Sequence, residues 1–247
     1  MQGNRSVDYV TRVFEDMEAI APELWDSLLA RQPAPTPFMR HAYLSAMVSS
    51  GSATPDTGWT LRLISLWQGE TLAAVCPVYL KRHSRGEYVF DWAWAEAYER
   101  HGLAYYPKAL VAPPFTPVPG SRLLAVDDHA REALVQALLV WCEAQQLPSL
   151  HLLFADETDR AACARAGLLQ RQQVQFHWQN AGWADFEAFL GSLNQEKRKK
   201  IRQERRKVRD AGITFRALQG QDMAPADWDF VQRCYHCLLY TSDAADE

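Results

Sequence analysis

The sequence predicts an α+β fold, with a mixed, largely antiparallel twisted sheet flanked by helices. Two apolar runs with a period of two, residues 59–67 and 71–80, are separated only by Gln-Gly-Glu, which is the pattern of a β-hairpin. Apolar residues at helical spacing precede and follow that hairpin. The chain has 247 residues, 48% apolar and 23% charged, which suits one large globular domain or two small ones. Strands and helices therefore alternate irregularly along one chain, as in α+β proteins.

The elements around the hairpin follow from spacing, capping and turn residues. Pro22 stands in the first turn of a helix, Asp127 and Asp128 are suited to cap a long one, and Gly167 ends another. Four apolar residues at i, i+3, i+4 and i+7, starting at Phe186, lie on one helical face. The expected elements are a strand over 7–15, helices from 22 and over 41–48, the hairpin, a helix over 128–143, a strand over 149–154, a helix over 157–166, and one or two strands over 168–178.

The stretch from Gly86 to Gly120 concentrates aromatic, charged and proline residues. Tyr88–Phe90 resembles the end of a strand, and Ala109–Ala112 a short buried one. The residues between them show neither helical nor strand periodicity. Long ordered loops of this kind are usually functional. A structural loop closed by its own aromatic side chains is the alternative, and composition does not decide between the two.

Charge is distributed very unevenly along the chain. The net charge is −4, yet residues 197–209 hold nine Lys or Arg against one Glu. Ile201 and Val208 provide a thin apolar seam for docking this helix, and we expect four basic residues to stay exposed on it: Lys197, Arg198, Lys200 and Arg202. The run is either a solvated face or a groove for an anionic substrate or a tRNA backbone. No helix-turn-helix or zinc spacing accompanies it, which argues against sequence-specific DNA binding.

Cysteines and targeting signals narrow the class of protein. Cys76, Cys142 and Cys163 stand in apolar surroundings and are expected in the core. No apolar run is long enough to span a membrane, and the N-terminus lacks a signal-peptide pattern, so we expect a cytoplasmic protein. We expect no metal site, since the Cys-x-x-Cys of Cys234 and Cys237 falls at the edge of a doubtful C-terminal segment.

Several longer segments carry a family resemblance. They are PFMRHAYLSAMVSSGS, CPVYLKRHSRGEYVFDWAWAEAYERHGLAYYPKALVAPPFTPVPGSRLL, QFHWQNAGWADFEAFLGSL and EKRKKIRQERRKVRDAGI. They resemble the bacterial FemAB-like family of predicted N-acyltransferases, which is similar to the Fem-type peptidoglycan aminoacyltransferases and is assigned to the acyl-CoA N-acyltransferase (GNAT) superfamily. The element order, with two early helices before antiparallel strands, also resembles a GNAT domain.

The resemblance implies two GNAT-like domains in tandem, over residues 7–168 and 169–236, with substrates between them. It further implies no permanently bound cofactor and an acyl donor that is either aminoacyl-tRNA or acyl-CoA. In the Fem-type enzymes the acceptor is a cell-wall precursor, and the resemblance leaves the acceptor amine of this family open. The second domain would be incomplete in this chain. Residues 237–247 resemble a translated transposase sequencing adapter and are expected to be non-native.

Acyl transfer to an amine needs a base and donors that hold the developing oxyanion. The candidate bases are Asp91, Glu96, Glu99 and His101; the candidate donors or relays are Tyr98, Tyr105 and Tyr106. We expect substrate to contact Trp92, Trp94, Tyr105, Tyr106, Lys108, and the four basic residues of the helix. A carboxylate beside the two tryptophans would have a raised pKa, which suits a base. The structural alternative pairs Asp91 and Glu96 with Arg100 or Lys108.

Two further features are weaker candidates. His177 stands between two aromatic residues and is expected to be a packed histidine. Residues 117–122 occupy the place of a GNAT pyrophosphate loop, but with one Gly and two Pro they are a poor phosphate cradle, which argues against ordinary acyl-CoA binding in the first domain. The sequence thus predicts an N-acyltransferase, with a non-catalytic module that binds tRNA or a phosphate-bearing precursor as the alternative.

Overall fold

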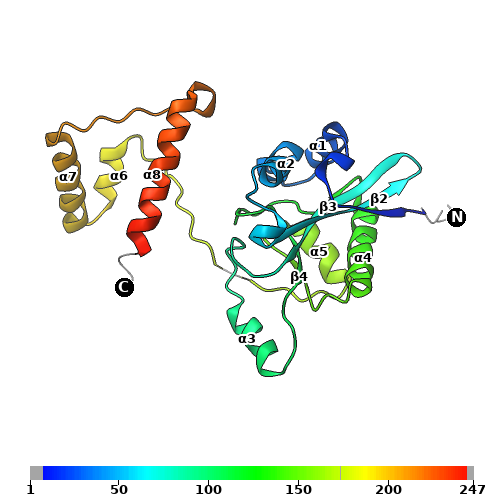
Figure 1. The fold of residues 1–247 in the computed structure, drawn as a ribbon. Helices are drawn as coiled ribbons and strands as arrows, with labels where there is room; N and C mark the ends of the chain where they lie inside the picture. The colour runs from blue at the N-terminus through cyan, green and yellow to red at the C-terminus, as the bar shows by residue number, and fades with distance from the viewer. Residues whose placement is uncertain (1–7, 173, 244–247) are drawn as a thin grey trace. The chain divides into compact units, whose positions relative to one another are not determined.

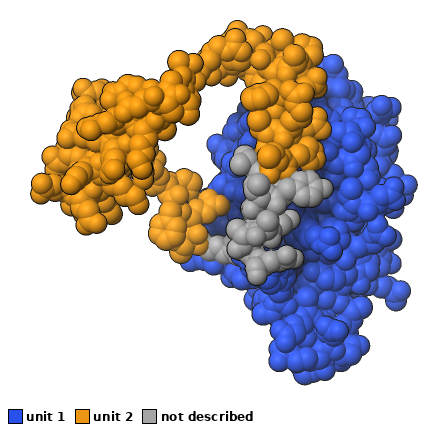
Figure 2. Space-filling view, turned by 60° about the vertical axis from the view of Figure 1, so that its left-hand side comes forward, with its two compact units in different colours: residues 1–173 blue, residues 174–247 orange. Residues whose placement is uncertain are grey.

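The structure is a computed structural model that describes residues 8–172 and 174–243 (Figure 1). The chain divides into two compact units, residues 1–173 and 174–247 (Figure 2). Val7, the expected start of the first strand, and residues 244–247 of the expected non-native segment lie outside the described residues. No helix in the described part of the chain is both long and apolar enough to cross a membrane.

Unit 1 contains one open mixed sheet, in the order β1-β2-β3-β4-β6, with β5 paired to β3. The hairpin of β2 and β3 and its pairing with β1 and β4 are antiparallel, whereas β4 and β6 run parallel. This confirms the predicted α+β class. The strands are β1 Val10–Phe14, β2 Trp59–Gln68, β3 Thr71–Lys81, β4 Lys108–Val111, β5 Leu124–Ala125 and β6 Leu150–Leu152.

Five α-helices of unit 1 accompany this sheet, and capping residues set several of their ends. Asp127 accepts a hydrogen bond from the amide of Ala130, as an N-cap does, and Pro22 occupies the first helical position of α1. The helices are α1 Pro22–Ala30, α2 His41–Ser49, α3 Trp92–Arg100, α4 Asp128–Ala144 and α5 Glu157–Arg165. All except α3 were predicted from the sequence.

Two apolar clusters cover the two faces of the sheet. On one face, Trp25 of α1 and Leu44 of α2 pack against residues such as Tyr79 of β3. On the other, Leu134 of α4 packs with Val78 and with Cys76, Cys142 and Cys163, which are the predicted core cysteines. Because side chains alternate between faces along a strand, each central strand contributes to both clusters.

Two sequence expectations are wrong. Tyr88–Phe90 forms no strand, and the chain enters α3 directly after it. Alanines at 93, 95 and 97 favour that helix, but none of its residues is buried, so it lacks the buried face by which the other helices of unit 1 were recognised. Among the described residues of 168–178 no strand forms either; Leu169 and Phe176 are more than 90% exposed and meet no sheet edge.

Unit 2 consists of helices α6 Phe186–Ser192, α7 Gln195–Asp210 and α8 Pro225–Asp243. Asp185 and Asn194 cap α6 and α7 through their side chains. Aromatic rings of Trp178, Trp183 and Phe189 stack on one another beside α6. Among its described residues, Leu190 is the only buried apolar side chain.

Candidate functional site

The segment that joins β3 to β4 builds the site. Gly86, with φ of 80°, turns the chain away from β3, and a Cβ there would lie 2.6 Å from the Phe115 ring. The chain then forms α3 and returns to β4. A surface pocket of about 390 Å³ opens beside α3, and it is lined by Trp92, Ala95, Glu96, Glu99, Leu103, Tyr105 and Tyr106.

Helical spacing explains why these residues share the pocket. Trp92, Glu96 and Glu99 are separated by four and three positions, so they project from one side of α3, and Leu103 joins them from the segment that follows the helix. Trp92 is 71% exposed, an unusual state for so large an apolar side chain. The pocket wall is therefore aromatic and carboxylate-bearing, and no Lys or Arg lines it.

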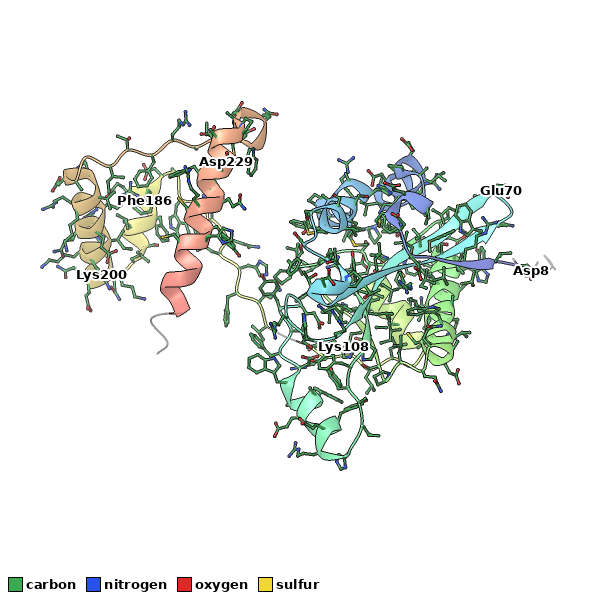
Figure 3. The ribbon with its side chains drawn as sticks, viewed as in Figure 1. Asp8, Glu70, Lys108, Phe186, Lys200 and Asp229 are labelled. Carbon is green, nitrogen blue, oxygen red and sulfur yellow. The ribbon has the colours of Figure 1, made fainter. Side chains whose placement is uncertain are left out.

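A cluster of buried charges, the β3–β4 charge cluster, lies under this segment. It contains Lys81, Glu87, Asp91 and Lys108, all nearly or fully buried. Lys81 and Lys108 are directly opposed in the antiparallel register of β3 and β4, which places both side chains on the same face of the sheet. The ammonium of Lys108, labelled in Figure 3, lies 2.8 Å from Glu87 Oε2 and 2.5 Å from Asp91 Oδ2.

The hydroxyl groups of Tyr105 and Tyr106, the two tyrosines that line the pocket, are hydrogen-bonded to Asp91 of this cluster and to Ser84 beside it. Tyr105 donates its hydroxyl proton to Asp91 Oδ2 at 2.8 Å. Ser84 Oγ also donates to Asp91 Oδ2, at 2.9 Å, and accepts from Lys108 at 2.8 Å. A hydroxyl has one proton, so the 2.8 Å contact between Ser84 and Tyr106 is a bond that Tyr106 donates. Both tyrosine protons therefore point away from the pocket.

Burial and pairing shift the cluster's pKa values in opposite directions. Burial would raise the pKa of Asp91, but hydrogen bonds from Lys108, Tyr105 and Ser84 outweigh it, and the pKa is lowered. For Glu87 burial prevails over Lys108, and the pKa is raised. Burial, opposed by Glu87 and assisted by Lys108, lowers the pKa of Lys81 to about 7. The raised pKa expected for a carboxylate beside Trp92 and Trp94 is therefore wrong for Asp91, and the cluster carboxylate whose pKa is raised, Glu87, was not predicted.

The structure gathers some predicted residues and separates others. Asp91, Tyr105, Tyr106 and Lys108 meet in or above the cluster, and the pairing of Asp91 with Lys108 is the structural alternative left open above. Trp92, Glu96 and Glu99 line the pocket. The remaining three do not line it: Tyr98 packs its ring on Tyr105 at 5.1 Å, while Trp94 and His101 are exposed.

Four residues of the site were missed. Lys81, Ser84 and Glu87 join the cluster from the end of β3 and the segment beyond it, and His151 of β6 packs its ring on Tyr105 at 6.1 Å. Burial and Lys108 lower the pKa of His151 to about 4. The sequence signal that could have found these residues is Lys81, the charged residue at the end of the largely apolar strand β3. A lysine at a strand end is usually exposed, so its burial could not be predicted before its partners were known.

Residues 117–122 do not form a phosphate cradle. The amide of Gly120 donates to the Phe154 carbonyl, that of Ser121 to the Ala34 carbonyl, and that of Arg122 to the Asp159 carboxylate. The Arg122 side chain is fully buried and donates to the carbonyls of Leu153 and Val118. The backbone donors that would bind phosphate are therefore already used within the fold.

The basic helix α7 docks on α6 through some of its cations. Arg198 donates to the Leu193 carbonyl at 3.1 Å and is half-buried, so the expectation that it stays exposed is wrong. Arg202 pairs with Glu187 at 2.6 Å, and Arg205 lies over the Phe186 ring at 4.2 Å. Ile201 and Val208 lie on this same face and are half-buried, as predicted.

The opposite face of α7 carries the free cations. Helical geometry places Lys200 and Lys207 roughly opposite the docking face, and Lys199 and Arg206 about a third of a turn away from it. All four are exposed, and none has a hydrogen-bond or ion-pair partner among the described residues. We call these four residues the outer basic face. Lys197 is exposed at its flank.

No group of three or more potential metal ligands occurs among the described residues. Comparison with curated proteins and with solved structures gives no significant match. A protein-family model does match: FemAB_like, described as peptidoglycan biosynthesis/recognition, aligns with residues 16–243. That match covers most of the chain, including the pocket, the charge cluster and the basic helix. The chain therefore belongs to the FemAB-like family.

Proposed function

We propose that this FemAB-like protein is a cytoplasmic N-acyltransferase that transfers an acyl or aminoacyl group to an amine, on a cell-wall precursor. The pocket beside α3 is the acceptor site. The observation that carries this proposal is the convergence of Trp92, Glu96 and Glu99 with two tyrosines over a buried charge cluster. Such a concave aromatic site with few polar groups is the usual form of a small-ligand site.

The pocket residues have distinct roles in this proposal. An ammonium is not nucleophilic, so a proton must leave the acceptor before its nitrogen attacks the acyl carbonyl. Glu96 is exposed on the pocket and takes that proton, whereas Asp91 is held by Lys108 and organises the tyrosines. The hydroxyl protons of Tyr105 and Tyr106 are directed to Asp91 and Ser84, so these two tyrosines shape the pocket and do not donate to the oxyanion.

The acyl donor carries phosphate, as aminoacyl-tRNA and acyl-CoA both do. The outer basic face of α7 is suited to it, because clustered cations attract phosphates. In this proposal residues 169–236 belong to a second GNAT-like domain, and the donor contacts its basic helix rather than residues 117–122. This assignment keeps the predicted anion contact at Lys200, drops those at Arg198 and Arg202, and adds Lys199, Arg206 and Lys207.

Turnover separates this proposal from the alternative of a non-catalytic binding module. The purified chain is incubated with aminoacyl-tRNA or acyl-CoA and with an amine-bearing muropeptide, and loss of donor is followed with time. An enzyme consumes donor and yields an N-acylated product that mass spectrometry identifies. Saturable, salt-sensitive tRNA binding without product would reject the transferase and favour the binding module.

Glu96→Gln and His101→Ala test the catalytic residues. Glu96→Gln should slow turnover, and His101→Ala should not, because His101 is exposed and does not line the pocket. If both variants transfer at the wild-type rate, the segment from Trp92 to His101 has no catalytic role.

A further inference from the structure

The pocket beside α3 presents aromatic faces and carboxylates to its contents. Trp92, Tyr105 and Tyr106 contribute rings, Glu96 and Glu99 contribute carboxylates, and no basic side chain lines it. The negative face of an aromatic ring attracts cations, and carboxylates do so as well. The carboxylates of Glu96 and Glu99 would repel a phosphate or carboxylate ligand, and no basic side chain lines the pocket to bind one.

The charge cluster beneath the pocket fixes how the tyrosines are presented. The Tyr105 and Tyr106 hydroxyls are hydrogen-bonded to Asp91 and Ser84, so neither hydroxyl proton is available to a ligand. The Tyr106 ring is half-buried and remains accessible, whereas the buried Tyr105 ring packs against it. Lys108 lies 5.3 Å and 5.7 Å from the two ring centroids. Its charge is compensated at short range by Glu87 and Asp91, so it does not make the pocket cationic.

We infer that this pocket is a cation–π site that recognises an alkylammonium group in its charged form. The inference deepens the proposed function, because it specifies how the acceptor amine is bound before it loses its proton. A quaternary ammonium ion should therefore bind too, although it cannot act as a nucleophile.

The test uses tetramethylammonium as the probe and tryptophan fluorescence or calorimetry as the readout on the full chain. The neutral isostere 3,3-dimethyl-1-butanol is compared with choline, which has the same shape and a positive charge. We expect choline and tetramethylammonium to bind and the alcohol to bind at least about fivefold more weakly. Equal binding of choline and the alcohol would reduce the site to an apolar pocket and overturn the inference.

Substitutions locate the binding. Trp92→Ala should weaken tetramethylammonium binding about fivefold or more, and Glu96→Gln with Glu99→Gln should weaken it further at low salt. Trp228→Ala removes an exposed tryptophan from α8 and is the matched control. Binding unchanged by Trp92→Ala would overturn the assignment to this pocket.

Tyr106 distinguishes ring recognition from hydroxyl recognition. Tyr106→Leu should weaken binding of the probe, and Tyr106→Phe should restore it, because the ring faces the cation. Failure of Tyr106→Phe to restore binding would contradict the inference, provided that circular dichroism shows both variants folded. Since binding needs no acyl donor, these results do not depend on whether transfer occurs. Absence of transfer with intact ammonium binding rejects the transferase alone.

Discussion

The β3–β4 charge cluster and helix α7 are both rich in charge, but they use it in opposite ways. In the cluster, Lys81 and Lys108 are fully buried, and Lys108 contacts two carboxylates and a serine. On α7, the outer basic face is exposed and has no partner among the described residues. Because the cluster charges are buried, the loss of any one of them should lower the stability of the fold. The exposed charges of α7 should instead act together on anion binding, and salt should screen them.

Removal of Lys108 should have the largest effect on stability. Lys108→Ala leaves Glu87 and Asp91 buried without their cation, which should lower the free energy of unfolding by about 3–5 kcal/mol. Lys199→Ala on the outer basic face is the matched control and should change it by less than about 0.5 kcal/mol. Chemical denaturation measures both. Similar small losses in the two variants would show that the cluster's charges are not structurally coupled.

The pH dependence of stability should reveal Lys81. Its pKa falls to about 7 in the folded chain, whereas an unfolded lysine titrates near 10.4, so the unfolded chain binds more protons between these values. The free energy of unfolding should therefore rise with pH in this window, by up to about 1.4 kcal/mol per unit. The groups around Lys81 are Glu87, Lys108 and the Trp59 ring. Lys81→Met should flatten this rise of the free energy of unfolding with pH. An unchanged slope in the variant would show that another group causes the pH dependence.

Charge reversal on α7 should alter binding and leave the fold intact. Lys199→Glu with Lys200→Glu should weaken tRNA binding about tenfold or more at low salt and reduce the salt dependence of the affinity. Filter binding across a salt series measures both quantities. Arg198→Gln with Arg202→Gln changes cations on the docking face and should weaken binding much less. The reverse order of effects would contradict the division of α7 into two faces.

The smallest effect is expected from an exposed ion pair of the same helix. Arg202 and Glu187 are each at least half-exposed, so their pairing contributes little. Glu187→Gln should lower the free energy of unfolding by less than about 1 kcal/mol, as thermal denaturation would show. A loss as large as that of Lys108→Ala would remove the distinction drawn between buried and exposed pairs.

The sequence predicted the fold where burial imposes a pattern. The hairpin, α1, α2, α4, α5 and α7 each carry an apolar face or seam, and each was found close to its expected bounds. Helix α3 buries none of its residues, so no core contact specifies it, and its mixture of tryptophans and charged residues was interpreted as a loop. The strands expected over 168–178 do not form among the described residues, because the apolar side chains of this segment pair with no edge of the sheet.

The candidate site was predictable in part. Asp91, Tyr105, Tyr106 and Lys108 stood out because aromatic and charged residues rarely crowd together in a short stretch. Their arrangement was not predictable, since it depends on the β3–β4 register that brings Lys81 opposite Lys108 across 27 positions of sequence. Glu87 and Ser84 become recognisable only after that pairing is known.

The central claim is that the pocket beside α3 holds the acceptor amine next to a base. The most direct measurement is the steady-state kinetics of Glu96→Gln in acyl transfer to an amine, beside wild type and the His101→Ala control. We predict that kcat falls by about 10²–10⁴-fold with a much smaller change in the KM for donor, and that His101→Ala is unaffected. A Glu96→Gln variant with wild-type kcat would contradict the claim.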